Sequence, residues 1–462
     1  MRSLLTAKKL LGVADQVPEL PSSFKGEPKY LSNKELEEYL RSHVQRCAPI
    51  SRMYSIGNST HGSPLWVLEI SDKPGREEAE PSFKYVANMH GDESLGRQLL
   101  VYLADWICDN YKKNDPLVTR IVRDMHLYLM PTMNPDGFAA KKRENANGMD
   151  LNRDFPDQGA VVANYPWDGT PDQSTTYSKS PDDVTFRFMA TTYARDHPFM
   201  ATPQNVEFPT GITNGAAWYP LYGGMQDWNY IHGHCLELTI ETCMSKSPQP
   251  DQLPKQWQDH QRSLVSYMLL VLEAGVRGFV YDACTGEPLP AEVTVSSIDW
   301  KVYAGKKFGD FYRILAPGIY RLVVSMEGYS TFSKQVSVVA GEQVNVNVLL
   351  MQKRARVDGP GGCPKKMLAG GDGSPGALRG KRLSVSGVSS VSKKMGAHMP
   401  EWNNEVHRGL RHQAAKPEKE KHQMLTGFAT ETCLILVVSS YVCFVFASRW
   451  RSYLTRKRII TV

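Results

Sequence analysis

Residues 26–275 alternate between short apolar runs and a longer segment with helical spacing. The runs FKYVANM (83–89) and MHLYLMPTM (125–133) have the length and composition typical of strands. Between them, the apolar side chains of SLGRQLLVYLADWICDNY (94–111) recur three and four residues apart, on one face of a helix. A strand, a helix and a further strand in this order predict an α/β fold, with helices packed on a mixed or parallel sheet.

From about Gly275 the pattern changes to short runs in which apolar and polar residues alternate. These runs are RGFVYDA, AEVTVSSI, YRLVVSME, QVSVVAG and VNVNVLL, and turns rich in Gly and Pro separate them. Alternation with a period of two is typical of strands that bury one face. Residues 276–352 are therefore expected to form a small all-β sandwich.

The C-terminal part contains a candidate membrane anchor. Residues 353–431 are rich in Gly, Ser, Lys and Arg, and we expect a disordered basic stalk there because few large apolar side chains are available for a core. Residues 432–448 are 17 uncharged residues, at the short end of what crosses a bilayer as a helix. Because a cluster of Arg and Lys follows, the positive-inside rule predicts a cytosolic tail at 449–462 and a body on the other side.

The charge is divided unevenly along the chain. The net charge of the whole chain is +6, and residues 353–462 hold 20 Lys and Arg against 7 Asp and Glu, so residues 1–352 carry −7. Nucleic-acid-binding surfaces need clustered cations, and an acidic body argues against a nucleic-acid partner.

Cysteines and the N-terminus bear on the cellular compartment. Eight cysteines without a CxxC pair exclude a disulfide scaffold or a zinc ribbon and are explained by core packing or one or two bridges.

The N-terminus is a poor signal peptide, because Lys8 and Lys9 interrupt its apolar residues. Either the true N-terminus is missing or altered, or the chain is tail-anchored with a cytosolic body. The sequon at Asn58 mildly favours the first alternative and a lumenal or extracellular glycoprotein.

Polar residues gather where the predicted strands end. His90 and Glu93 follow the first strand with HxxE spacing, which allows an imidazole and a carboxylate to reach one cation. An isolated HxxE, however, usually consists of exposed side chains that bind no metal. Two polar loops, NPDG (134–137) and DLNRDFP (150–156), come later. Asn152 and Arg153 could form a fork for a carboxylate, or simply a solvated ion pair.

Several motifs in matching order resemble one enzyme family. The motifs NMHGDE, NPDGF, NANGMDLNRDFPD, GITNGAAWY, GGMQDWNY and CLELTIE resemble those of the zinc metallocarboxypeptidases, in the regulatory (N/E) branch. The resemblance extends from about residue 26 to 352, because GDFYRILAPGIYRL is similar to the transthyretin-like domain of that branch. The membrane span and basic tail are most similar to plant carboxypeptidase D-like membrane proteins. The resemblance implies a zinc carboxypeptidase domain at 26–275 and a transthyretin-like sandwich at 276–352.

The resemblance implies roles for four residues of the reaction. His90 and Glu93 match the first two zinc ligands, Glu241 matches the general base, and Arg143 matches the residue that polarises the scissile carbonyl. A carboxylate beside zinc can accept a proton from water and return it to the leaving amine. The alternative for Glu241, without the resemblance, is a glutamate on the solvent face of a strand edge.

The resemblance also implies a substrate class. Asn152, Arg153 and Tyr219 match the residues that hold the terminal carboxylate of the peptide. Asp168 matches the acidic residue of the side-chain pocket, with Gln226 nearby, and an acidic pocket favours C-terminal Lys or Arg. The alternative for Asp168 is a turn residue.

The chain departs from the family pattern at one point. In the family a helix and a core strand follow the Asn-Arg loop, and that strand ends in the histidine that is the third zinc ligand. Here Gln158 is followed directly by Gly159, and the family pattern resumes in frame, which resembles an internal deletion. His197, His232 and His234 are substitutes by number only. We expect weak zinc binding, because a catalytic zinc normally takes a further protein ligand.

Three hypotheses follow. The first is a zinc carboxypeptidase that removes C-terminal Lys or Arg from peptides or proteins in the secretory or endosomal pathway. The second is a non-catalytic, membrane-anchored peptide-binding or adhesion ectodomain, which loss of the third ligand favours for this chain. The third is a non-productive splice form that does not fold.

Overall fold

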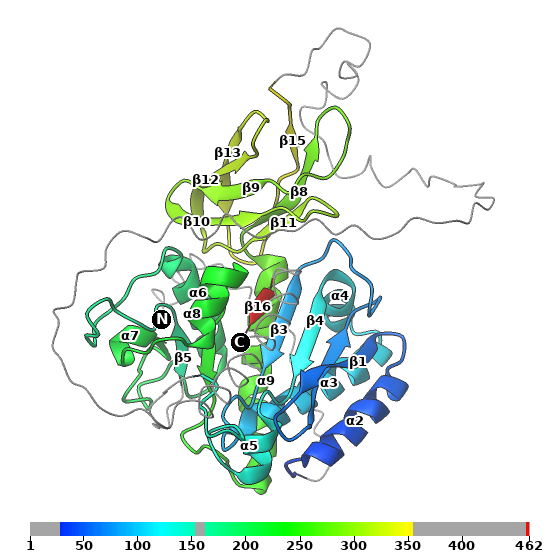
Figure 1. Cartoon of the computed structure of the whole chain (residues 1–462), viewed down its shortest axis with the longest axis vertical. Coiled ribbons are helices and arrows are strands. Elements are labelled where there is room, and N and C mark those ends of the chain that lie inside the picture. The colour runs from blue at the N-terminus through cyan, green and yellow to red at the C-terminus, as the bar shows by residue number, and fades with distance from the viewer. Residues whose placement is uncertain (1–27, 153–161, 354–458, 462) are drawn as a thin grey trace, which may run out of the picture. The chain divides into compact units, whose positions relative to one another are not determined.

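The computed structural model describes residues 28–152, 162–353 and 459–461 (Figure 1). The helices are α2 (Asn33–Arg46), α3 (Leu95–Lys112), α4 (Pro116–Asp124), α5 (Pro135–Ala140), α6 (Asp183–Asp196), α7 (Gly215–Trp218), α8 (Met225–Gly233), the 3-10 helix η1 (Pro250–Gln252) and α9 (Leu253–Glu273). The strands are β1 (Ser51–Asn58), β2 (Pro64–Ile70), β3 (Ser82–Val86), β4 (His126–Met130), β5 (Val162–Tyr165), β6 (Ile212–Asn214), β7 (Thr239–Glu241), β8 (Val276–Asp282), β9 (Glu292–Val295), β10 (Ile298–Tyr303), β11 (Asp310–Arg313), β12 (Gly318–Ser325), β13 (Phe332–Val338), β14 (Val344–Asn345), β15 (Val348–Leu350) and β16 (Ile459–Thr461).

A mixed sheet forms the first half of the α/β region. Its strand order is β1-β2-β4-β3-β16, in which β3 runs parallel to β4 and β16, and the other pairs are antiparallel. All five side chains of β4 are buried, as expected for a strand covered on both faces. The two apolar runs expected as strands are β3 and β4, and the prediction of a mixed sheet is confirmed.

The α/β region contains a second, three-stranded sheet. Its order is β6-β5-β7, with β5 parallel to β6 and antiparallel to β7. Among the residues that the structure describes, β3 and β7 have no pairing with each other or through a common neighbour, so the two sheets remain separate. Ser82–Lys84 of β3 pair instead with β16 from the end of the chain (Figure 1).

Helices α3 and α9 bury their apolar faces in one core with the first sheet. The segment expected as a helix, 94–111, is α3, and side chains on its inner face such as Leu103 and Ile107 are fully buried. The hydroxyl of Tyr85 on β3 donates to the carbonyl of Leu264 on α9 at 2.6 Å. This bond fixes β3, and with it the loop that follows β3, against α9.

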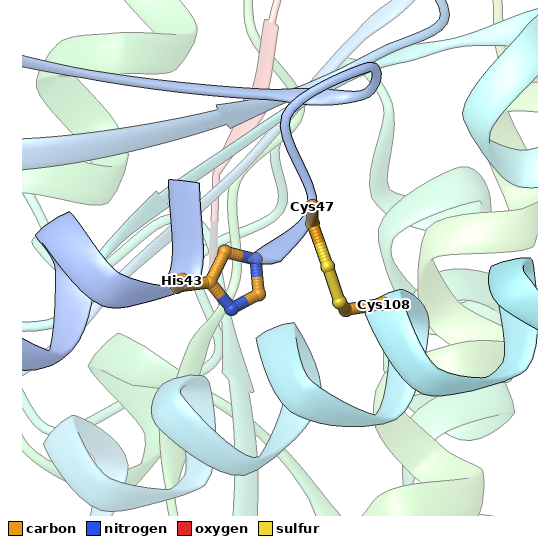
Figure 2. A group of neighbouring side chains, drawn as sticks. All are labelled: His43, Cys47 and Cys108. Atoms are coloured by element: carbon orange, nitrogen blue, oxygen red, sulfur yellow. A yellow bond between two sulfur atoms is a disulfide. The ribbon is translucent and has the colours of Figure 1, made fainter. Parts of the chain in front are cut away.

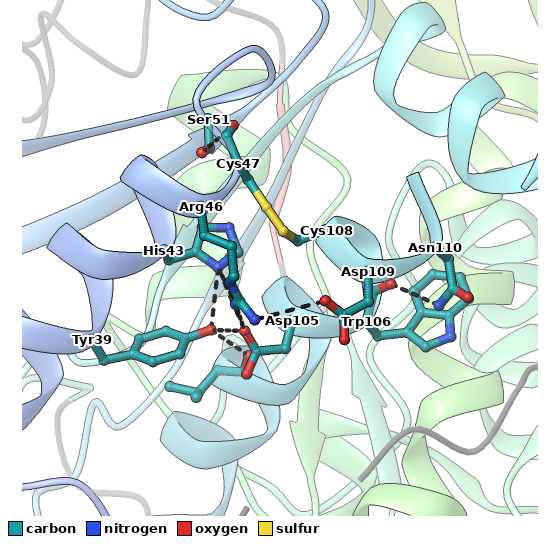
Figure 3. The surroundings of a disulfide bond; sticks show 11 residues. Tyr39, His43, Arg46, Cys47, Ser51, Asp105, Trp106, Cys108, Asp109 and Asn110 are labelled. Atoms are coloured by element: carbon teal, nitrogen blue, oxygen red, sulfur yellow. Dashed lines mark hydrogen bonds and ion pairs between the residues drawn. A yellow bond between two sulfur atoms is a disulfide. The ribbon is translucent and has the colours of Figure 1, made fainter. Parts of the chain in front are cut away.

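A disulfide joins α2 to α3. Cys47, directly after α2, is bonded to Cys108, and His43 lies beside them (Figure 2). Around this bridge, Asp105 accepts hydrogen bonds from the Tyr39 hydroxyl, at 2.8 Å, and from the Arg46 guanidinium (Figure 3). The bridge closes a sequence separation of 61 residues and ties the first helix to the core.

The C-terminal β-rich region is a sandwich of two sheets. One sheet has the order β10-β9-β12-β13, and the other has the order β11-β8-β14, with β15 also paired to β8. Val280, Val293, Phe311 and Leu322 are fully buried between them. The prediction of an all-β sandwich is confirmed.

The predicted membrane segment falls outside the described residues. The stalk beyond Lys353, the span at 432–448 and most of the tail belong to this part of the chain. Within the described ranges, no helix combines the length and the apolar character needed to cross a bilayer.

Candidate active site

His90 and Glu93 lie in the loop that connects β3 to α3. Asn88 holds this loop: it adopts a φ of 56°, which asparagine tolerates better than most residues, and its amide donates to the carbonyls of His90 and Glu93 at 2.8 and 3.1 Å. The hydroxyl of Thr132 donates to the other end of the Asn88 amide at 2.8 Å. As a result, Nδ1 of His90 lies 2.9 Å from Oε2 of Glu93.

Asp150 and Arg143 complete the surroundings of this pair. An oxygen of Asp150 lies 2.9 Å from Nε2 of His90, so each ring nitrogen faces a carboxylate oxygen to which it donates when protonated. Arg143 donates through Nε to Asp150 and through Nη1 to Glu93, each at 3.0 Å. Burial lowers the pKa of His90, but the hydrogen bonds with Asp150 and Glu93 outweigh burial and raise it to about 9.

The His90–Glu93 pair has the donor types of a zinc site. An imidazole nitrogen and a carboxylate oxygen are both ordinary zinc ligands, and the second ring nitrogen is oriented by a carboxylate, as is usual for zinc-bound histidines. The pair fits zinc as a partial ligand set. Among the described residues that line the cavity, His90 is the one histidine.

The three substitute histidines lie elsewhere. Nδ1 of His197 accepts backbone N–H groups at 3.1 and 3.2 Å, and its ring packs on His260. The ring of His232 packs on Trp228, and that of His234 on Trp300. None of the three is among the described residues lining the cavity, so the structure gives no support to substitution by any of them.

Two other groups of metal-binding residue types occur in the described part of the chain. His43, Cys47 and Cys108 lie together, but the two sulfurs are joined in the disulfide (Figure 2). The carboxylates of Glu78 and Glu80 lie near His126, outside the cavity that holds His90. Neither group was expected from the sequence as a zinc site.

Glu241 faces the same cavity as the metal-ligand pair. It ends β7 and lines a cavity of about 160 Å³ together with His90, Glu93, Arg143 and Asn152. Burial, followed by the nearby charge of Glu93, raises the pKa of Glu241 to about 7. A carboxylate with a pKa near neutrality can both accept and return a proton, which general acid–base catalysis requires.

Asn152 is fixed at the edge of this cavity. It is buried, its backbone N–H donates to Asp150 at 2.8 Å, and its side-chain oxygen accepts the N–H of Met225 at 2.8 Å. Arg153 lies outside the described residues. The hydroxyl oxygen of Tyr219 is buried, and burial, then the charges of Glu241 and Asp168, raise the pKa of this phenol far above its usual range.

Asp168 forms a second, fully buried acidic site. Its Oδ1 accepts hydrogen bonds from the side-chain amides of Gln226 at 2.7 Å and Asn164 at 3.1 Å, while its backbone N–H donates to Asp227 at 3.0 Å. These bonds join it to other side chains rather than to the backbone of the next residues, which is not the pattern of a turn residue. Burial and the neighbouring Asp227 raise the pKa of Asp168 well above its usual range.

The Asp168 site is close to Asn152 but outside the described lining of the cavity. A Cβ atom at Gly224 would lie 3.2 Å from Oδ2 of Asp168 and 3.7 Å from Oδ1 of Asn152. Oδ2 of Asp168 has no hydrogen-bond partner among the described residues. The structure thus groups His90, Glu93, Arg143, Asn152 and Glu241 in one cavity, and Asp168 with Gln226 beside it.

Asp150 was not expected from the sequence as a site residue. The polar loop at 150–156 contains a second aspartate, Asp154, with the same side-chain chemistry. The available signal in the sequence was the position of Asp150, two residues before Asn152 in the same motif. In the structure, Asp150 accepts the backbone N–H of Asn152.

Comparisons with known proteins agree with this geometry. The family model for zinc carboxypeptidases, Peptidase_M14, matches residues 36–161 and 157–263, and that for the carboxypeptidase regulatory-like domain matches 275–351. The two segments of the first match meet where the sequence analysis places the missing segment.

Three relatives illustrate the similarity. Carboxypeptidase SOL1 of Arabidopsis thaliana is 46% identical over 349 residues, which cover 68% of this chain and 70% of that protein. Carboxypeptidase D of Mus musculus is 38% identical over 405 residues, or 76% of this chain, but the chain spans only 29% of its length. Carboxypeptidase M of Mus musculus is 37% identical over 367 residues, covering 68% of this chain and 82% of that protein. With its two matched domains in this order and its identity to these carboxypeptidases, the chain belongs to the zinc carboxypeptidase family.

Proposed function

We propose that the site recognises peptides or proteins with a C-terminal Lys or Arg, and that it is built for zinc-dependent removal of that residue. The observation that carries this proposal is the single cavity shared by the His90–Glu93 pair, Arg143 and Glu241. A metal-ligand pair, a cation and a carboxylate with a pKa near neutrality form the set of groups that hydrolysis of a peptide bond requires.

His90 and Glu93 would hold the zinc. When bound, zinc acts as a Lewis acid and makes water a stronger acid. Glu241 then accepts a proton from water at its carboxylate and returns it to the leaving amine. Arg143, which already lies 3.0 Å from Glu93, carries the positive charge that stabilises the developing negative charge on the carbonyl oxygen.

Recognition of the substrate rests on two groups of residues. Asn152, Arg153 and Tyr219 would hold the terminal carboxylate, which restricts cleavage to the last residue. The Asp168 carboxylate, held by Gln226, would receive the basic side chain, because Oδ2 is buried and without a hydrogen-bond partner in the described part of the chain. A guanidinium or ammonium group would supply that partner.

A second candidate function is peptide binding without hydrolysis. The two-residue metal-ligand set of the described cavity favours it, and the family match divides where a third ligand is expected. We propose that the chain as written binds zinc weakly and has little carboxypeptidase activity, while the recognition site remains. The two candidate functions predict different rates of peptide hydrolysis but the same binding of the peptide.

One experiment separates them. The full chain is incubated with zinc, and release of arginine from a peptide ending in Arg is measured with and without a chelator, together with binding of that peptide and of its C-terminally amidated form. We expect little release, with binding only of the free carboxylate. Robust, chelator-sensitive release would overturn the proposed inactivity. Insertion of a helix–strand–His segment of the family type between residues 158 and 159 should restore activity.

We further propose that the body is lumenal or extracellular and anchored by a helix at 432–448. The Cys47–Cys108 disulfide supports an oxidising compartment. A span with the body on the opposite side would separate Ile459–Thr461 from β3, so the β16 pairing belongs to a chain that is not inserted. Protease treatment of intact microsomes tests the orientation. The tail should be digested and the body protected, and digestion of both from the same side would refute the orientation.

A further inference from the structure

Helix α8 carries two side chains that hold Asp168. Gln226 donates to its carboxylate at 2.7 Å, and Asp227 accepts its backbone N–H at 3.0 Å. Gln226 is itself held by the hydroxyl of Thr239 on β7, at 2.9 Å. The position of α8 therefore determines where the Asp168 carboxylate points.

Tyr230, one turn further along α8, connects this helix to the β-sandwich. Its ring is fully buried and lies 5.2 Å, between centroids, from Trp167, the residue before Asp168. The same ring stacks on Trp300 of β10 in the sandwich, with centroids 4.4 Å apart and an angle of 24° between the planes. A single aromatic side chain thus contacts both the Asp168 segment and the second domain.

Asp182 provides a second connection at the same place. It accepts the hydroxyl proton of Tyr230 at 2.8 Å, and both of its oxygens accept from Nη2 of Arg313 on β11, at 2.8 and 3.0 Å. The side chains of Arg313 and Asp182 are 1% and 0% exposed. A buried pair of this kind is held firmly, because loss of either partner leaves an uncompensated charge.

We propose that the β-sandwich sets the substrate specificity of the neighbouring domain. Trp300 and Arg313 are positioning residues: they hold Tyr230 and Asp182, which hold α8, and α8 holds the Asp168 carboxylate. This inference rests on the proposed function, since it takes Asp168 as the group that receives a basic side chain. Neither Trp300 nor Arg313 lines the described cavity of His90 and Glu241. Replacing them should therefore change the discrimination between substrates, through Asp168, and not the groups that carry out hydrolysis.

The test compares three variants of the full chain, Trp300→Ala, Trp300→Phe and Tyr329→Phe. Two readouts are measured: the ratio of affinities for paired peptides ending in Arg and in Leu, and amide hydrogen exchange of α8. Trp300→Ala should lower the ratio by about threefold to tenfold, the effect of losing one aromatic pair, and accelerate exchange of α8. Trp300→Phe retains an aromatic ring, so its affinity ratio and its exchange rate of α8 should stay close to those of the unmodified chain. Tyr329→Phe removes a 2.8 Å bond to Asp282 elsewhere in the sandwich and should change neither.

Each outcome decides the proposal. Unchanged exchange of α8 in a folded Trp300→Ala chain, or an equal loss of affinity for both peptides, would overturn it. If the unmodified chain binds both peptides equally, the proposed function is refuted, whereas faster exchange of α8 still supports the connection. Should Trp300→Ala not fold, the double variant Arg313→Met with Asp182→Asn removes both charges together; the same lowered ratio supports the proposal, and an unchanged ratio and exchange rate refute it.

Discussion

Asp150 and His90 are joined by a hydrogen bond of 2.9 Å between a carboxylate oxygen and Nε2 of the ring. The bond fixes the orientation of the ring, and with it the direction of Nδ1 toward Glu93. Although burial acts to raise the pKa of Asp150, its hydrogen bond with His90 and the charges around it lower the pKa far below the usual range. Asp150 therefore favours its ionised form, and the carboxylate holds the ring in one orientation.

Replacement of Asp150 should weaken metal binding. In a chain with the His-containing segment inserted, Asp150→Asn should reduce zinc affinity by about 10–100-fold, as loss of an outer partner of a ligating histidine usually does. Competition with a chelating dye measures this affinity. Asp172→Asn, an exposed residue bonded to Ser174 at 2.7 Å, is the matched control and should bind zinc normally. Equal affinities for the two variants would contradict the orienting role.

Glu241→Gln should abolish turnover in the same inserted chain while leaving peptide affinity nearly unchanged. The amide has the volume of the carboxylate but cannot accept a proton from water. Single-turnover release of arginine and equilibrium binding of the peptide give the two quantities separately. Near-normal turnover would show that Glu241 is not the base.

Asp168→Ala should reduce discrimination for basic over apolar C-termini by about 2–5 kcal/mol, the usual cost of unpairing one member of a desolvated charge pair. The loss should fall on the peptide ending in Arg, because an apolar side chain never met the charge. Catalytic efficiencies on peptides ending in Arg and Leu, in the inserted chain, give the comparison. A purely structural role for Asp168 would instead produce the same fractional loss on both peptides.

Glu80 predicts a pH dependence of stability. Burial, with the neighbouring carboxylates of Asp72 and Glu78, raises its pKa from 4.5 to about 7. The folded state retains a proton that the unfolded state releases, so the contribution of Glu80 to the free energy of unfolding falls as the pH rises from 4.5 to about 7. Glu80→Gln should match the unmodified chain near the lower limit and be more stable by roughly 1–3 kcal/mol above the upper one.

Urea unfolding at the two ends of this pH window measures the difference. Glu38→Gln makes the same chemical change at a side chain that is 63% exposed and should give a curve parallel to that of the unmodified chain. The interpretation fails if Glu80→Gln is also parallel to the unmodified chain.

Periodicity predicted the parts of the fold that depend on local patterns. The helical spacing at 94–111 and the alternation after Gly275 each reflect one buried face, and both became the expected elements, α3 and the β-sandwich. The motif around His90 could be placed on a loop because a strand precedes it and a helix follows.

Contacts between distant segments could not be predicted from local sequence patterns. The bond between His90 and Asp150 joins residues 60 positions apart, and the loop that contains Asp150 offers a second carboxylate, Asp154, with the same local chemistry. The pair of Asp182 and Arg313 spans 131 positions and two domains. Neither residue type nor spacing distinguishes these side chains from solvated ones, because only the folded sheets bring them together.

The separation of β3 from β7 has a consequence for the behaviour of the protein in solution. A strand edge without a neighbour presents N–H and C=O groups that pair with any extended chain within reach. On the edge of β3 opposite β4, the pairing seen among the described residues covers Ser82–Lys84, through Ile459–Thr461 of the same chain. Withdrawal of that end, as membrane insertion of the preceding segment would require, leaves the edge open to a neighbouring copy. We therefore expect self-association to rise with protein concentration, and the usable concentration range to be limited by this edge.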